Sequence, residues 1–433
     1  MTRHMTAKKD PMPRLTLTAL LATAALPALA PAAHAVTEAE VVQTYADLAQ
    51  AGYGDSLTTA RDLQAAVAAL VAAPSAQTLD AARSAWKAAR VPYQQTEAFR
   101  FGNPIVDDWE GRVNAWPLDE GLIDYVDPGY GQSEENPLST LNVIASPQIT
   151  IGSRQIDATQ ITPALIRDSL HEADGIEANV ASGYHAIEFL LWGQDLNGTG
   201  PGAGNRPFTD FATGTDCTGG NCDRRAAYLT AATDLLVSDL EEMAAHWAAD
   251  GAARKAVTDD PARGIRAMLT GMGSLSYGEQ AGERMKLGLM LNDPEEEHDC
   301  FSDNTQNSHF YDGLGIRNVY LGSYTRPDGS TISGPSLSEL VAERDGALDT
   351  RLRAELDASV AALQALKDAA DGGFAYDQML EAGNQKGAAL IMGAVDALVT
   401  QTASIERAVT LMGMTDVSFE GSDSLDNPSA VFQ

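Results

Sequence analysis

The chain has 433 residues, which is enough for two domains. It carries 60 acidic against 29 basic residues, a net charge of −31, so its surface repels nucleic acid and anionic lipid and attracts cations. This balance argues against a nucleic-acid partner.

The first 35 residues have the pattern of a bacterial signal peptide. Basic residues precede an apolar run over 15–29, and Ala33-His34-Ala35 has the small-x-small form of a cleavage site. No stop-transfer pattern follows, and the chain after cleavage would begin at Val36 rather than at a lipidated cysteine. We therefore expect secretion to the periplasm or cell envelope of a bacterium, with no transmembrane segment once residues 1–35 are removed.

Helical periodicity dominates the rest of the chain, and no alternating β-branched run is long enough for a sheet core. The expected helices are Glu38–Ala51, Asp55–Ala72, Ala76–Arg100, Pro163–Ala173, Ile176–Gly193, Asp223–Ala249, Gly264–Asn292, Ser336–Lys367 and Tyr376–Met412. We predict an all-α fold of two helical bundles, 36–221 and 222–433. Long irregular loops are expected over 102–160, 197–221 and 293–334, where Pro, Gly, Asn and Asp are frequent.

One face of the 76–100 helix carries a polar and aromatic stripe. Its members, at spacings of 4, 3, 4 and 3, are Trp86, Arg90, Tyr93, Glu97 and Arg100. Glu97 and Arg100 have two interpretations, a local ion pair or a pair that faces a functional cavity. The following loop, with Trp116 and Asp119, would then fold back over that cavity.

The next helix contains Gly183-Tyr-His185-Ala-Ile-Glu188, within an otherwise apolar run. Residues three apart project from nearly the same helix face, so both side chains can reach one ligand. A buried carboxylate needs a cation, a metal or a donor, or else it stays protonated. The two alternatives are a satisfied core pair and a metal site in which Glu97 supplies a further carboxylate.

Cys217 and Cys222 flank a turn-prone spacer, so in an oxidising compartment we expect a local disulfide rather than a zinc site. That pairing leaves Cys300 without a defined partner.

The 264–292 helix repeats part of the earlier stripe, with Glu279, Glu283 and Lys286 at spacings of 4 and 3. Glu97-Ala-Phe-Arg100 and Glu283-Arg-Met-Lys286 could be equivalent positions of a duplication, and a similar echo links residues 186–188 to 404–406. The two bundles would then be related to each other, and Glu283 would be a further donor for the site.

The segment 293–305 is rich in oxygen ligands and contains His298. A solvated acidic loop is one interpretation, and a metal-binding role for His298 is the other.

Together these residues resemble the imelysin family, also called the M75 peptidase-like family, in its iron-regulated branch. The resemblance is carried by Gly183-x-His185-x-x-Glu188, by Glu97-Ala-Phe-Arg-Phe-Gly102 and Trp116-Pro-x-Asp119, and by Glu295-x-Glu-His298. It implies two helical bundles related by duplication, a site at His185 and Glu188, and a role in iron acquisition. Iron or another divalent or trivalent metal is the implied cofactor, and envelope iron-uptake components are the implied partners.

Three functions are compatible with the sequence. A binding protein would hold a metal ion, a metal chelate or a small ligand between the bundles. A metallopeptidase would use His185 and Glu188, although the His-Glu-x-x-His motif of thermolysin-like zinc enzymes does not occur in the chain. An adaptor would bind a partner peptide without metal.

Overall fold

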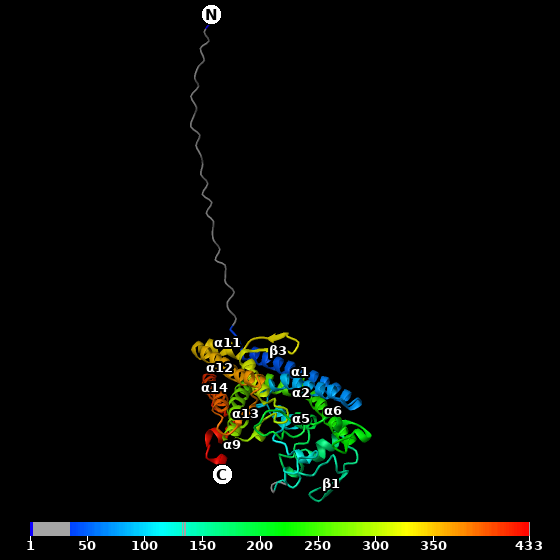
Figure 1. The fold of residues 1–433 in the computed structure, drawn as a ribbon. Coiled ribbons are helices and arrows are strands. Elements are labelled where there is room, and N and C mark those ends of the chain that lie inside the picture. The colour runs from blue at the N-terminus through cyan, green and yellow to red at the C-terminus, as the bar shows by residue number, and fades with distance from the viewer. Residues whose placement is uncertain (3–34, 132, 134–135, 433) are drawn as a thin grey trace. The chain divides into compact units, whose positions relative to one another are not determined.

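The computed structural model describes residues 1–2, 35–131, 133 and 136–432. From Val36 onward the chain forms one compact unit of packed helices (Figure 1). The all-α fold class is confirmed, because helices dominate the described residues and the strands form only two short hairpins. The predicted signal peptide falls almost wholly outside the described residues.

The longer helices are α1 (Glu38–Ala72), α2 (Ala76–Gln94), α3 (Pro104–Asn114), α5 (Gly183–Trp192), α6 (Cys222–Trp247), α8 (Pro261–Ser274), α10 (Thr305–Leu321), α12 (Gly346–Asp371) and α14 (Gln385–Leu411). The shorter ones are α4 (Pro163–Leu165), α7 (Ala252–Thr258), α9 (Gly288–Leu291), α11 (Leu337–Arg344), α13 (Tyr376–Leu380) and α15 (Asp423–Asp426). The 3₁₀ and π-helical segments include η1 (Glu97–Phe99), η3 (Ile166–Leu170) and η7 (Leu275–Leu287).

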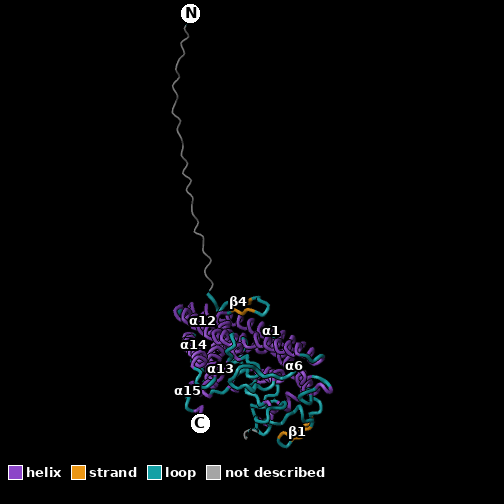
Figure 2. Tube along the Cα trace, in the orientation of Figure 1, coloured by secondary structure: helices purple, strands orange, loops and turns teal. Residues whose placement is uncertain are grey.

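Strand β1 (Gln148–Ile151) pairs antiparallel with β2 (Arg154–Asp157), and β3 (Ser323–Thr325) pairs antiparallel with β4 (Thr331–Ser333). The two hairpins lie at opposite edges of the helical unit, and most loops gather on the side of the β1–β2 hairpin (Figure 2). The sheets therefore contribute little to the core.

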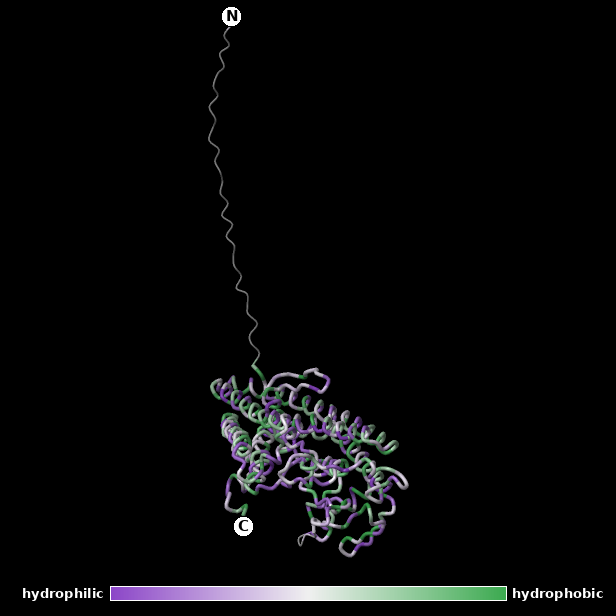
Figure 3. The backbone as a smooth tube through the Cα atoms, in the orientation of Figure 1, coloured by the Kyte–Doolittle hydropathy of each residue, from purple (hydrophilic) through white to green (hydrophobic). Residues whose placement is uncertain are grey.

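Side-chain caps explain where several helices begin. Thr37 and Glu40 form a capping box at α1, and Ser336 and Glu339 form another at α11. Ser75 caps α2 through the backbone N–H of Thr78. Hydrophilic and hydrophobic residues are interspersed along most helices, as is usual for helices that place one face in the core (Figure 3).

Helices from both predicted bundles pack against each other. α1 packs against α2 and also against α6, which follows the expected boundary at residue 221. α12 packs against α14 and α10. The division into bundles 36–221 and 222–433 stays a prediction, and duplication stays one too. The two four-residue segments that suggested the duplication have different local structures. Glu97 lies in the 3₁₀ turn η1, whereas Glu283 lies in the π-helix η7.

Several predicted helix bounds are wrong, for identifiable reasons. α1 runs unbroken through Gly52 and Gly54, where a break was expected, because its buried face packs on α2 and α6. α2 ends at Gln94, two residues after Pro92, and the chain continues into the 3₁₀ turn η1. Glu97 and Arg100, the last two residues of the predicted stripe, therefore lie outside the α-helix.

Two predicted loops contain helices. α3 lies in the segment 102–160 and α10 lies in 293–334, although Asn, Gly and Asp are frequent in both. α10 has almost no amphipathic pattern and is buried on several sides, so periodicity could not reveal it.

Helix α14 is long and apolar enough to cross a membrane by length and composition, with a mean hydropathy of 1.5. In this structure it packs against α12, α13 and η7, in the manner of a core helix. The absence of a transmembrane segment after residue 35 stays a prediction.

Cys217 and Cys222 are joined in a disulfide, with their Cα atoms 6.0 Å apart. Cys300 is free and half-buried. The bridge closes the turn that leads into α6 and lies apart from the residues described next.

Candidate metal centre at His185, His298 and Asp299

Helix α5 is buried along its whole length and carries the Gly-x-His-x-x-Glu segment. His185 is 1% exposed and Glu188 is 0% exposed. The spacing of three residues puts them side by side, so that Nδ1 of His185 lies 3.1 Å from Oε2 of Glu188. The other carboxylate oxygen, Oε1, accepts from the backbone N–H of Ser302 at 3.0 Å.

Gly183 is the first residue of α5, and its conformation explains why the segment begins with glycine. Its φ is +79°, in the region that favours glycine. A Cβ atom there would lie 2.4 Å from the backbone oxygen of Val113 in α3. The glycine therefore allows α5 and α3 to approach closely, and this fixes where His185 lies.

Replacing Gly183 with alanine is expected to lower the free energy of unfolding by about 2–5 kcal/mol, through left-handed strain and overpacking against backbone. Gly393 on α14 is the matched control, because nothing lies within 4 Å of its added Cβ. Gly393→Ala should be neutral or stabilising by up to about 1 kcal/mol. Urea denaturation followed by circular dichroism measures both. Equal stability of the two variants would show that the close approach to Val113 is not rigid.

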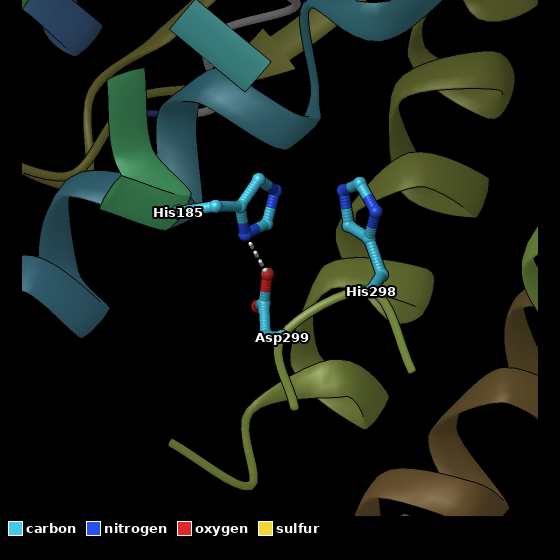
Figure 4. A group of neighbouring side chains, drawn as sticks. All are labelled: His185, His298 and Asp299. Carbon is cyan, nitrogen blue, oxygen red and sulfur yellow. Dashed lines mark ion pairs between the residues drawn. The ribbon is translucent and has the colours of Figure 1, made fainter. Parts of the chain in front are cut away.

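His298 and Asp299 come from the segment between η7 and α10, more than a hundred residues after α5, yet they lie against His185 (Figure 4). The imidazole rings of His185 and His298 meet edge-on, with centroids 4.9 Å apart and an interplanar angle of 73°. Oδ1 of Asp299 is 3.9 Å from Nδ1 of His185. Each of the three residues offers a ligand atom within 4.8 Å of the other two.

Asp299 is held in place by a set of donors. Arg90 of α2 donates to its Oδ1 at 2.9 Å, and Asn304 donates to Oδ2 at 2.8 Å. Ser308 of α10 also donates to Oδ2. Burial alone would raise the pKa of Asp299, but the Arg90 guanidinium and these donors hold it below its usual value. The group is therefore an ionised carboxylate in a fixed position.

The two imidazoles lack partners at the atoms that could bind a metal. Nε2 of His185 and both ring nitrogens of His298 are buried and have no hydrogen-bond partner among the described residues. Burial, assisted by Arg90, lowers the pKa of His185 to about 3, and burial with Arg284 nearby lowers the pKa of His298 well below its usual value. Both rings are neutral at physiological pH, which is the form that binds metals.

Glu188 is a second buried carboxyl group beside the three residues. Burial raises the pKa of Glu188 well above its usual value, and the neighbouring Asp299 raises it further. Arg90 is the buried cation in direct contact with Asp299. A cation bound at the two imidazoles would favour the ionised form of Glu188 and so oppose the effects of burial and of Asp299.

The other predicted site residues are divided between several places. Trp116 packs edge-on against the His298 ring, with centroids 5.9 Å apart. Asp119 accepts from Tyr130 and Asn136 within its own loop. Glu283 and Lys286 are half-buried on η7, and Glu283 lines a surface hollow with the C-terminal segment.

Glu97 and Arg100 belong to a separate buried ion cluster. Arg284 of η7 bonds Glu97 at 2.8 Å, Glu279 at 2.7 Å and Asp312 of α10 at 3.1 Å. Arg100 lies 3.6 Å from Glu279, which joins it to the same cluster. The structure therefore does not bring Glu97 into the His185 group, because Arg284 engages its carboxylate.

Glu110 of α3 borders this cluster, and its ionisation should make the stability of the protein depend on pH. Burial raises its pKa to about 7, although Arg100 lies 3.5 Å away and opposes the shift. Since the folded pKa exceeds the unfolded one, its contribution is fully present below about pH 4.5 and is lost as pH rises through 7. Glu110→Gln should therefore gain stability relative to wild type by about 2 kcal/mol between pH 5 and pH 8. Urea midpoints across that range measure it, and a pH-independent difference would contradict it.

Sequence reasoning did not select Asp299, Ser302 or Arg90 as site residues. Asp299 directly follows His298 in a segment rich in oxygen ligands, which was the available signal. Arg90 lies on the stripe of α2, three residues before Tyr93. The contact of Ser302 is made by its backbone, which no residue pattern could reveal.

Comparison with known proteins identifies the family of the chain. The imelysin family (peptidase M75) matches residues 49–405, which is most of the chain. "Iron-regulated protein A" of Synechococcus elongatus is 41% identical over 64 residues, 14% of this chain and 18% of that protein, so the match spans under a fifth of the relative.

A solved structure from Parabacteroides distasonis, named as an iron-regulated protein A precursor, has the same fold with a TM-score of 0.63 and 21% identity. It covers 88% of this chain and 97% of that chain. The family match includes the Gly-x-His-x-x-Glu segment of α5 and the His298–Asp299 segment. The chain belongs to the imelysin family.

Proposed function

We propose that this protein is an exported, iron-uptake-linked binding protein that holds one metal ion through His185, His298 and Asp299. The observation that carries the proposal is the convergence of these three side chains from distant segments, with Nε2 of His185 and both ring nitrogens of His298 left without hydrogen-bond partners among the described residues. Buried polar atoms are nearly always paired, so unpartnered ring nitrogens beside an ionised carboxylate indicate a ligand.

The donor set favours a borderline metal. Two imidazoles and one carboxylate suit iron, zinc and similar ions, and this combination is characteristic of non-haem Fe²⁺ sites. The iron-regulated relatives support iron within that group. None of the three residues is more than 2% exposed, which favours a bare ion over a chelate or a larger small molecule.

Glu188 has a supporting role in this proposal. Its Oε2 lies beside Nδ1 of His185, so it would accept a hydrogen bond from Nδ1–H. Nε2 of the ring would then be unprotonated and free to bind the ion. Its other oxygen is held by the Ser302 backbone. A carboxylate behind a metal-bound histidine fixes the ring and increases its basicity.

The metallopeptidase alternative receives less support from the geometry. A catalytic metal needs an open coordination position and a base that reaches its water. Here the candidate ligands are buried, and the nearest spare carboxylate, Glu188, is engaged by His185 and Ser302.

Metal analysis tests the proposal. Protein stripped with a chelator and reloaded with Fe²⁺ under anaerobic conditions should retain one ion per chain after desalting, and it should not cleave unfolded protein. No stoichiometric metal would overturn the proposal. Metal-dependent cleavage that Glu188→Gln abolishes would establish the peptidase instead. Capture of an envelope protein that chelators do not affect would indicate the adaptor.

The cellular setting is part of the same proposal. The signal-like pattern of residues 1–35 and the precursor name of the structural relative support export to the periplasm or cell envelope. Envelope iron-uptake components would be the partners there. Fractionation of a producing bacterium tests this, and a cytoplasmic protein that retains residues 1–35 would contradict it.

A further inference from the structure

Three aspartates from distant parts of the chain meet outside the His185 group. Asp195 follows the end of α5, Asp303 precedes α10, and Asp377 lies on α13. Each offers a carboxylate oxygen within 4.8 Å of the other two. Since they come from three separate elements, the fold brings them together, and they are not a run of solvated charge.

Two of the three carboxylates, those of Asp377 and Asp303, have oxygens without an internal partner among the described residues. Asp377 is 2% exposed, and neither of its oxygens has a hydrogen-bond partner among the described residues. Oδ1 of Asp303 is buried and unpartnered as well. Asp195 accepts through Oδ1 from Asn197 at 2.8 and 2.9 Å. A buried carboxylate without a donor is costly, so the arrangement indicates a ligand.

Two further acids adjoin the three. Glu297 is 1% exposed, and its Oε2 has no hydrogen-bond partner among the described residues. On the Asp195 side of the cluster lies a cavity of about 10 Å³, room for one water-sized sphere, which Asp195, Glu295 and Glu297 line. Lys87 lowers the pKa of Asp303 by its charge, while its Nζ donates to the Ser302 carbonyl at 2.9 Å.

The electrostatics agree with the geometry. Burial raises the pKa of Asp303 to about 6 and that of Asp377 to about 7, and the neighbouring carboxylates add to both shifts. Burial and the adjacent acids likewise raise the pKa of Glu295 to about 7. Each group would be ionised more readily beside a cation.

We propose that Asp195, Asp303 and Asp377, with Glu297 beside them, form a second cation site that takes Ca²⁺. All of these donors are oxygens, which hard cations prefer, whereas the His185 group offers two imidazoles to a softer ion. Ca²⁺ accepts irregular coordination by carboxylates from several elements, whereas Mg²⁺ demands near-octahedral geometry and keeps most of its waters. No ligand is shared with the proposed iron site.

Calcium titration of the chelator-treated protein by isothermal calorimetry tests this site. Wild type should bind one Ca²⁺ per chain, and the Tm should rise by about 3 °C at a hundred times the Kd. Asp377→Asn should weaken Ca²⁺ binding at least about 10-fold, which corresponds to the loss of one charged ligand. Without Ca²⁺ the same variant should have a Tm equal to or above that of wild type, because one buried repulsive charge is removed.

Two control variants distinguish this site from Ca²⁺ binding by the acidic surface or by the imidazoles. Asp396 is exposed on α14, so Asp396→Asn should leave the calorimetric titration unchanged. His298→Gln should leave Ca²⁺ binding unchanged while it removes the proposed iron site. Binding that persists in Asp377→Asn would overturn the proposal, since Ca²⁺ would then be held by the acidic surface. Binding lost in His298→Gln would overturn it too, by placing Ca²⁺ at the imidazoles.

Discussion

Replacing His298 with glutamine is expected to lower the affinity of the protein for Fe²⁺ by about 100-fold or more. Loss of a residue that only supports a metal ligand costs about 10–100-fold, and His298 would be a ligand itself. Glutamine fills similar space beside Trp116, so the fold should be retained. Competition with a chromophoric chelator measures the affinity, and circular dichroism checks the fold.

His246 provides the matched control for this variant. It is a half-exposed histidine on α6, 3.7 Å from Glu242 and remote from the candidate site in the sequence. His246→Gln should bind Fe²⁺ like wild type. If His298→Gln retains wild-type affinity while His185→Gln loses it, the ion is bound without His298, and the assignment of this ligand is wrong.

Replacing Arg284 with methionine is expected to lower the free energy of unfolding by about 3–5 kcal/mol at neutral pH. The guanidinium is 3% exposed and forms ion pairs with Glu97, Glu279 and Asp312. The side chain of Asp312 is fully buried. Methionine fills the space but leaves these carboxylates without their shared cation. Urea denaturation followed by circular dichroism measures the loss.

The pH dependence of this loss has a defined sign. Burial raises the pKa of Asp312 well above its usual value although Arg284 opposes the shift, so without Arg284 the contribution of this acid is present at low pH and is lost as pH rises. The destabilisation should therefore be larger at pH 8 than at pH 5. Arg351→Met, at an exposed arginine on α12, is the control and should change stability by less than about 0.5 kcal/mol. A loss below about 1 kcal/mol for Arg284→Met would show that the acids find other partners.

The long helices could be predicted from the sequence because capping residues and apolar periodicity agree there. Ser75 and Ser336 mark real helix starts, and the all-α class follows from the same pattern. The pairing of His185 with Glu188 could also be predicted, since an i, i+3 spacing inside a helix fixes a local geometry.

The rest of the site depends on tertiary packing, which spacing does not encode. Asp299 meets His185 only because the segment before α10 folds onto α5, and nothing local indicates that contact. The sequence predicts Glu97 as a site residue because the expected helix Ala76–Arg100 includes it and would place it on the same face as Arg90. The helix ends at Gln94 instead, and Arg284, whose partners come from three elements, engages the carboxylate of Glu97.

The candidate ligands lie on both sides of residue 221, with His185 from α5 and His298 and Asp299 from the segment before α10. Neither piece of the chain, produced alone, would contain a complete coordination sphere. A bound ion would act as a cross-link between the early and late parts of the polypeptide, so proteolytic nicking between them would be tolerated better in loaded than in stripped protein. Metal retention would thus report on correct assembly of the whole molecule.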